Sequence, residues 1–151
     1  MIKTEYYKDL TKMNTFGMKV KARCFIEYDS VADLVDIEFE ELARPVLHIG
    51  GGSNLLFTDD FKGTVLHSKI DFIEILDEGP EVLVSVGAGV VFDDFCAWAA
   101  KEGLWGVENL SYIPGEVGAS AVQNIGAYGV EVKDVIRTVY CYDTAEEEFV
   151  S

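Results

Sequence analysis

The sequence predicts an α+β fold of two small α/β lobes, the first over residues 1–70 and the second over residues 71–151. Segments with the composition of strands alternate with two segments of helical periodicity. In each lobe, one of these strands runs directly into a turn of small residues. Hydrophobic residues make up 49% of the 151-residue chain, so the chain can bury a sizeable core.

The first 21 residues are expected to form a polar lead that contains the segment Asn14-Thr15-Phe16-Gly17. Phenylalanine is one of the residue types most often buried in proteins. We therefore predict that Phe16 packs into the core and pins this lead to the first lobe.

Residues 22–28 and 46–49 have the apolar composition of strands, and a helical pattern lies between them. The helix is predicted to run from Val31 to about Ala43, with Ser30 as its N-cap and Pro45 beyond its end. A strand–helix–strand unit usually places its two strands parallel. We therefore expect these strands to be parallel.

A glycine turn follows the second of these strands, with the sequence Gly50, Gly51, Gly52, Ser53 and Asn54. Successive N–H groups in such a turn can form a nest for a phosphate, and the last two side chains add donors. The spacing is that of neither a Rossmann fingerprint nor a P-loop. Because many glycine turns bind no ligand, the motif alone leaves both interpretations open.

Residues 64–66 and 72–76 are predicted to form further strands, with Gly63 and Asp71 as breaks and with the change of lobe near residue 70. Residues 82–86 form a further predicted strand, which runs into the turn at residues 87–89. Because this turn and the earlier glycine turn end strands in successive lobes, we expect them to face one another across a cleft.

A helix is predicted from Phe92 to Glu102, followed by Gly103 at its C-terminal cap, because apolar residues recur there at helical spacing. Asp93 and Asp94 lie in its first turn. Adjacent residues do not share a face of a helix, so we expect these carboxylates to stabilise the helix dipole rather than to bind a metal.

The end of the chain is predicted to form a hairpin, with one strand at residues 135–142, a turn at Asp143-Thr144 and the start of a partner strand at residues 148–151. The sequence stops within this predicted hairpin. We therefore expect a fold that is incomplete at the C-terminus, as in a fragment of a longer protein.

The stretch from residue 109 to residue 129 is rich in Gly, Ala and Ser, and Glu116 is its single carboxylate. Small side chains let a ligand approach the main chain closely, which suits a flat, anionic ligand. Stretches of this composition also occur where a loop packs tightly against a sheet. Composition alone does not decide between the two.

The formal net charge of −15 argues against a nucleic acid or an anionic membrane as partner. Residues 71–151 hold three basic against sixteen acidic side chains, so an anionic ligand would have to be held mainly by backbone amides. The three cysteines are far apart, and suggest neither a disulfide framework nor a zinc site. The charged N-terminus and the lack of a long apolar run predict a cytoplasmic protein.

The chain has two histidines, His48 and His67, and neither is near a Ser or Cys at a recognisable nucleophile spacing. A catalytic triad or a histidine metal site is therefore unsupported. His48 lies two residues before the glycine turn and could reach a ligand, but we expect a histidine whose hydrogen bonds are satisfied within the strand.

Three segments, in this order, resemble the UDP-N-acetylenolpyruvoylglucosamine reductases (UDP-N-acetylmuramate dehydrogenases), which are flavin enzymes of peptidoglycan precursor synthesis. They are NTFG at residues 14–17, PVLHIGGGSNLL at residues 45–56 and IPGEVGASAVQNIGAYG at residues 113–129. The resemblance implies a PCMH-type FAD-binding fold with FAD between the two lobes. It also implies a separate substrate-binding domain, which we expect to be absent from this chain.

The resemblance also implies roles for individual residues. The glycine turn at residues 50–54 would hold the FAD pyrophosphate, and Tyr128 would lie toward the substrate. Some members have Ser or Gly where this chain has Ala119, so a backbone contact is the safer expectation there. The residues implied to lie along the flavin are Ile113, Pro114, Gly115, Ala119, Ser120, Val122 and Gln123.

The implied reaction uses NADPH to reduce the flavin, which then reduces UDP-GlcNAc-enolpyruvate to UDP-N-acetylmuramate. In the family, an Arg, a Ser and a Glu act on the substrate from segments further along the chain, and Arg137 does not match that Arg by motif. No catalytic residue is therefore assigned here, and the fragment alone is expected to be inactive.

Two alternatives stay open. Another PCMH-type flavoprotein oxidoreductase, such as an oxidase of a hydroxy acid or a sugar, often has a flavin-attaching His where this chain has Ser53-Asn54. A non-catalytic module could instead present its acidic lobe to a protein partner. Such a module would purify colourless and would stay colourless when FAD is added.

Overall fold

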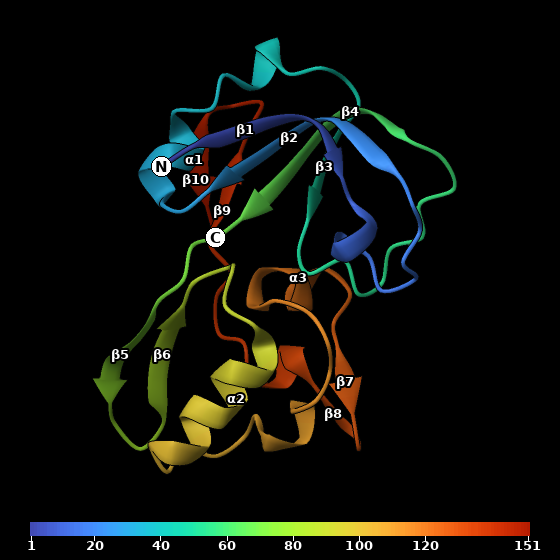
Figure 1. Ribbon diagram of the computed structural model, residues 1–151. Helices are drawn as coiled ribbons and strands as arrows, with labels where there is room; N and C mark the ends of the chain where they lie inside the picture. The colour runs from blue at the N-terminus through green and yellow to red at the C-terminus, as the bar shows by residue number, and fades with distance from the viewer.

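The computed structural model describes residues 1–151, apart from the side chain of Glu78. A four-stranded sheet in the order β1-β2-β4-β3 forms the upper part of the molecule (Figure 1). β1 runs antiparallel to β2, whereas β2 and β3 both run parallel to β4, which lies between them. The predicted parallel direction of β2 and β3 is confirmed, although they are not neighbours. The strands are β1 (Lys3–Asp9), β2 (Lys21–Tyr28), β3 (Val46–Ile49) and β4 (Phe61–Ser68).

Both faces of this sheet are buried, as is usual where parallel strands are covered on two sides. One face of β2 presents Cys24, Ile26 and Tyr28 to a hydrophobic cluster that also contains Leu66 of β4. Phe25 points to the opposite cluster. Because each face is apolar, a one-residue slip of β2 would exchange the contents of the two clusters.

The predicted long helix is wrong beyond its first turn and a half: α1 covers only Val31–Val35. The predicted cap is confirmed, because Ser30 Oγ accepts a hydrogen bond of 3.1 Å from the N–H of Asp33. Leu34, Ile37 and Phe39 all pack on the same cluster of the sheet. In a continuous helix Phe39 would point about 140° away from Leu34, so the chain leaves the helix to bury both.

The N-terminal segment also differs from expectation. Residues 3–9 of this segment form β1. Phe16 is 64% exposed, so the prediction that it anchors the segment in the core is wrong. Asn14 anchors the segment instead: it is 5% exposed, and its side-chain amide bonds the main chain of Leu10 and Met18. A buried amide with its hydrogen bonds satisfied fixes the loop without an apolar contact.

Gly63 was expected to interrupt a strand but lies inside β4. A Cβ added at this position would lie 1.8 Å from the carbonyl oxygen of Pro45, and the next residue, Thr64, donates an N–H to that same oxygen at 2.9 Å. Glycine is required here because two backbones approach closely, not because the strand ends.

The lower part of the molecule has its own core, formed by Phe92, Cys96, Leu110, Ile125 and Val132. The predicted helix from Phe92 is confirmed as α2, and Gly103 follows it with a φ of +73°. The elements are β5 (Ile73–Glu78), β6 (Val82–Val86), α2 (Phe92–Lys101), α3 (Val117–Val122), β7 (Gly126–Ala127) and β8 (Val130–Glu131).

The chain ends in an antiparallel hairpin of β9 (Cys141–Asp143) and β10 (Glu148–Val150), as predicted. The predicted strand at residues 135–140 is wrong, because Val135 instead closes a 3-10 turn by donating its N–H to Val132. Figure 1 shows the hairpin beside α1, and the ring of Tyr142 lies 6.1 Å from that of Phe39. A division of the chain at residue 70 stays a prediction.

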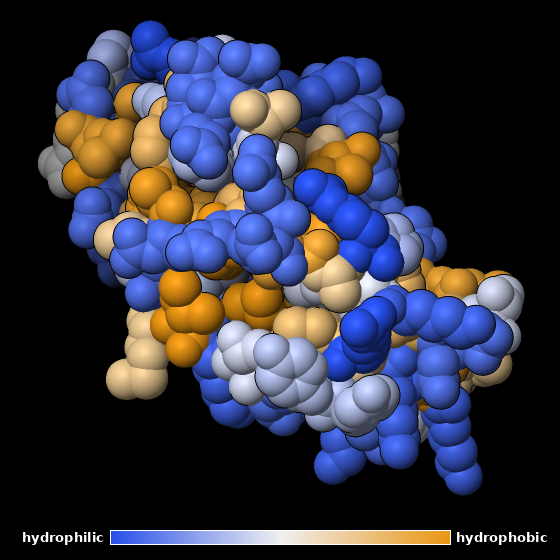
Figure 2. Space-filling model, turned by 90° about the horizontal axis from the view of Figure 1, so that it is seen from above, coloured by the Kyte–Doolittle hydropathy of each residue, from blue (hydrophilic) through white to orange (hydrophobic). Residues whose placement is uncertain are grey.

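Hydrophilic residues cover most of the face seen from above, with hydrophobic residues visible between them (Figure 2). Within the described part of the chain, no helix combines the length and the apolar character needed to cross a membrane. The longest of the α-helices that the structure describes, α2, has ten residues.

Candidate functional site

The start of α3 lies between the two small-residue turns. On one side, a Cβ added at Gly50 would lie 2.8 Å from Cβ of Ala119. On the other side, Gly118 donates its N–H to the carbonyl of Ala88 at 3.0 Å, and a Cβ added at Gly118 would meet Cβ of Ala88 at 2.7 Å. The turns therefore do not face each other across an open cleft. Both pack against the small residues of α3.

Gly51 differs from these packed glycines. It is exposed, and the nearest atom to an added Cβ would be Cα of Gly115, at 3.8 Å. Within the described residues, the N–H groups of residues 51–54 donate no hydrogen bond to another protein group. The turn thus presents a run of free donors beside an open position, which is the arrangement expected of an anion nest.

The segment Asn14-Thr15-Phe16-Gly17 is hydrogen-bonded to this turn. The carbonyl of Gly52 accepts the N–H of Thr15 at 3.3 Å, and the hydroxyl of Thr15 donates to the carbonyl of Ser53 at 3.1 Å. A Cβ at Gly52 would lie 1.9 Å from the carbonyl oxygen of Met13. These contacts fix the carbonyl side of the turn and leave its N–H side free.

Two side chains tie the turn to the stretch at residues 113–123. Ser53 Oγ donates to the carbonyl of Pro114 at 3.0 Å, and Asn54 Nδ2 donates to Gln123 Oε1 at 2.5 Å. The structure thus brings together residues that are 61 and 69 positions apart in the sequence. Asn54, Pro114 and Gln123 are exposed, so a ligand has access to this junction.

The other residues implied to lie along the flavin have different environments. Ser120 is 3% exposed and donates its hydroxyl to the carbonyl of Val117, while Ile113 packs against the core of the lower part. Val122 is 88% exposed and Tyr128 is 90% exposed. Several of these residues line one small hollow of about 10 Å³, namely Pro114, Gly115, Ala119, Ser120 and Gln123.

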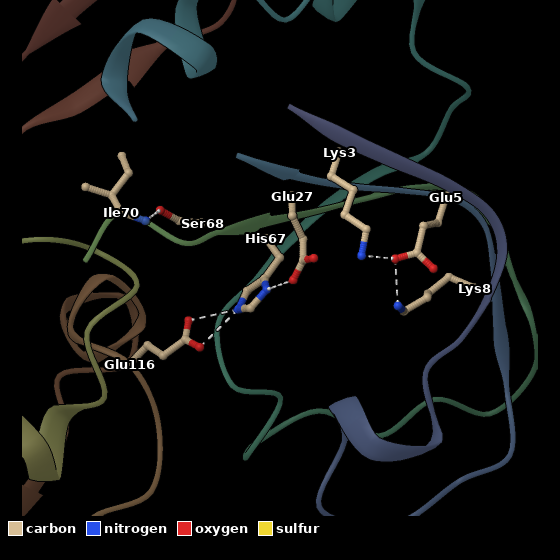
Figure 3. Close-up of polar contacts among 8 residues, drawn as sticks. All are labelled: Lys3, Glu5, Lys8, Glu27, His67, Ser68, Ile70 and Glu116. Atoms are coloured by element: carbon tan, nitrogen blue, oxygen red, sulfur yellow. Dashed lines mark hydrogen bonds and ion pairs between the residues drawn. The ribbon is translucent and has the colours of Figure 1, made fainter. Parts of the chain in front are cut away.

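A buried ion-pair cluster lies directly behind the turn, and sequence reasoning missed it. His67 Nδ1 is 3.1 Å from Glu27 Oε1, and His67 Nε2 is 3.0 Å from Glu116 Oε1 (Figure 3). Glu27 stands opposite His67 in the register of β2 and β4. The available signal was that Glu116, a lone carboxylate in a small-residue stretch, needs a partner if it is buried.

The electrostatics of His67 favour the charged ring. Burial lowers the pKa of the imidazole, but the hydrogen bond and charge of Glu116 and the hydrogen bond of Glu27 outweigh burial, so the pKa of His67 is raised above its ordinary value. His48, by contrast, bonds the hydroxyl of Tyr28 through Nε2 at 2.8 Å. This bond pairs one of the two ring nitrogens of His48, in keeping with the predicted strand histidine.

Comparison with known proteins adds three findings. The family described as FAD binding domain matches residues 22–150. The chain is 55% identical over 143 residues to a UDP-N-acetylenolpyruvoylglucosamine reductase of Bacteroides fragilis, covering 93% of this chain and 43% of that protein. It is 49% identical over 149 residues to the reductase of the same name from Neisseria meningitidis serogroup A, covering 97% of this chain and 43% of that protein. The chain thus spans less than half the length of these curated relatives.

The comparison with solved structures concerns the fold. The chain resembles the crystal structure of a UDP-N-acetylenolpyruvylglucosamine reductase from Thermus caldophilus, with a TM-score of 0.65 and 24% sequence identity, over 89% of this chain and 46% of that one. Together with the matched family, this likeness confirms the predicted α+β, PCMH-type FAD-binding fold.

Proposed function

The chain belongs to the family of FAD binding domains, and we propose that it is the FAD-binding part of a UDP-N-acetylenolpyruvoylglucosamine reductase. The observation that carries the proposal is the glycine turn, where the N–H groups of residues 51–54 have no protein acceptor and lie beside the stretch at residues 113–123. Turns of this kind hold phosphates through main-chain donors.

The residues present fit a diphosphate. Gly51 leaves open the position that a side chain would otherwise fill, whereas a Cβ added at Gly115 would meet Ser53 Oγ at 3.4 Å. The turn itself carries no carboxylate. The N–H groups of residues 51–54 would hold the pyrophosphate of FAD, with Asn54 able to add its side-chain amide. When bound, the cofactor supplies the redox chemistry, because no protein side chain carries out hydride transfer by itself.

The stretch at residues 113–123 would lie along the flavin. Ile113 and Ser120 are turned into the protein, so we assign them a contribution through the backbone. Pro114, Val122 and Gln123 are exposed and could contact the ring system directly. In this arrangement the chain positions the flavin and shields one side of it.

For the whole protein, we propose NADPH as the hydride donor and UDP-GlcNAc-enolpyruvate as the substrate, with Tyr128 toward that substrate. The support is the identity to the curated relatives that carry the reductase name. The same relatives are the ground for proposing a role in peptidoglycan synthesis and a cytoplasmic location.

Titration with FAD, followed by quenching of flavin fluorescence, tests the proposal. We expect Gly51→Ala to fold normally, because the added Cβ would meet nothing closer than 3.8 Å. We expect it to weaken FAD binding about tenfold, because the methyl group crowds the N–H groups. Gly79→Ala is the matched control, since its added Cβ meets only the carbonyl of Glu81, at 3.6 Å, in a distant turn. A wild-type chain that stays colourless with excess FAD contradicts the proposal and favours the non-catalytic protein-binding module.

A further inference from the structure

The cluster of Glu27, His67 and Glu116 has a geometry that specifies its charge. Each ring nitrogen of His67 faces a carboxylate oxygen, at 3.1 Å and 3.0 Å. A carboxylate only accepts hydrogen bonds, and a neutral imidazole has a single N–H to donate. With both acidic groups ionised, the two hydrogen bonds can form at once only if the ring is protonated.

The cluster is largely shielded from water. His67 is 4% exposed and Glu116 is 8% exposed, whereas the side chain of Glu27 is 25% exposed. Burial of the ring and Lys69, which follows β4, both oppose the positive charge, while His48 on β3 has its own pKa lowered by burial and by the charge of His67. The two carboxylates outweigh burial and Lys69, since the pKa of His67 is raised.

Glu116 also lies against the glycine turn. A Cβ added at Gly50 would be 3.4 Å from Glu116 Oε2, and one added at Gly51 would be 4.0 Å from Glu116 Oε1. A carboxylate at this position opposes the binding of an anion to the same turn, because two negative charges at such short range repel each other with little screening. The opposition is removed when a positive charge is paired with that carboxylate.

We propose that His67 is a positioning residue for the diphosphate of the ligand: its imidazolium holds and neutralises Glu116 behind the turn, so that residues 51–54 can accept an anion. This inference rests on the proposed binding of FAD. Binding of an anion at the turn then requires two things: free N–H groups at residues 51–54, and a proton on His67, which does not itself touch the ligand.

The consequence is a pH dependence of affinity. As the pH rises through the pKa of His67, the cluster loses one positive charge and Glu116 is left with a net negative field at the turn. We expect the affinities for FAD and for ADP, which contains the same diphosphate without the flavin, to fall about tenfold together. A ligand without phosphate, such as riboflavin, should show no such fall.

The experiment combines calorimetric titration of the folded chain with FAD, ADP and riboflavin between pH 6 and pH 9 with an NMR titration of the imidazole of His67. Glu116→Gln should remove the pH dependence and bind FAD more tightly than the wild type at pH 9. His67→Gln should bind at pH 6 as weakly as the wild type does at pH 9. His48→Gln, the matched histidine control, should still lose affinity for FAD as the pH rises, because His67 and Glu116 remain paired.

The possible failures are distinguishable. If FAD binds with the same affinity across the titration of His67, and His67→Gln is no weaker than the wild type at pH 6, the inference is wrong and the proposed function stands. If neither FAD nor ADP binds at any pH, although NMR shows a protonated His67, the proposed function itself is wrong. Circular dichroism of the three variants separates loss of binding from loss of the fold.

Discussion

The two small-residue turns of this chain are alike in composition and opposite in what the fold does with them. At residues 87–89, the N–H groups of Gly87 and Gly89 donate to the carbonyls of Phe72 and Ile70, both at 2.9 Å. At residues 51–54, none of the N–H groups donates a hydrogen bond to an acceptor in the described part of the chain. A glycine turn is therefore a candidate ligand site only when its donors are left free.

The two turns also differ in the space around their glycines. A Cβ added at Gly87 would lie 2.3 Å from the carbonyl oxygen of Ile70, so this glycine is needed by the fold. A Cβ added at Gly51 would meet nothing closer than 3.8 Å. Absence of a side chain at Gly51 has no explanation in internal packing, and a ligand that approaches the main chain supplies one.

Among the substitutions that test this difference between the two turns, Gly87→Ala should have the largest effect on stability. The added methyl group collides with backbone atoms that cannot move independently, so we expect the free energy of unfolding to fall by about 3 kcal/mol. Urea denaturation followed by circular dichroism measures it. A loss below about 0.5 kcal/mol would show that the packed turn is as open as the free one.

The next largest effect concerns the cluster behind the free turn. His67→Gln leaves two carboxylates without their charged partner, and we expect unfolding to be easier by about 1–3 kcal/mol at pH 6. The sign with pH follows from the raised pKa of His67 in the folded chain, relative to the ordinary value of 6.5. The stabilisation is fully present below the unfolded-state pKa and is lost as the pH rises through the folded-state value.

Denaturation of wild type and His67→Gln between pH 5 and pH 9 tests this sign. The difference in stability between the two should shrink as the pH rises. A difference that is constant with pH would mean that His67 contributes through packing alone and not through its charge.

A smaller effect is expected from Ser53→Ala. The hydroxyl of Ser53 is partly exposed and donates to the carbonyl of Pro114, so its loss should cost about 0.5–1 kcal/mol of stability. It should also weaken FAD binding less than Gly51→Ala does, because the N–H groups remain free. Equal losses of affinity would indicate that the hydroxyl, rather than the main chain, is the principal donor.

The smallest effect on stability is expected from Gly51→Ala, within about 0.5 kcal/mol of the wild type, even though the same change weakens FAD binding. Paired thermal denaturation and FAD titration on one preparation measure both quantities. A large loss of stability would show that Gly51 is required by the fold, and the contrast between the two turns would then disappear.

Local patterns in the sequence were sufficient for the elements whose contacts are near in the chain. The cap at Ser30, the helix from Phe92 and the final hairpin all depend on neighbours within a few residues. The length of α1 could not be predicted in this way. It depends on Phe39 and Ile37 reaching the same cluster of the sheet, which is a property of the packed core.

The site shows the same limit. Its motifs at residues 50–54 and 113–129 are visible in the sequence, and the resemblance they carry is in keeping with the matched family. Composition did not reveal which glycines are packed and which are open. Nor did it pair His67 with Glu116, which is 49 residues away and sits on a different element.

The sequence by itself determined where donors are concentrated, because Gly, Ser and Asn gather at one strand end and small residues at one later stretch. Only the tertiary structure decided that residues 51–54 keep their N–H groups free, and that a buried histidine stands behind Glu116. The physical reason is that hydrogen-bond satisfaction and burial depend on what lies nearby in space. Segments distant in the chain set that environment, and no local window of sequence contains them.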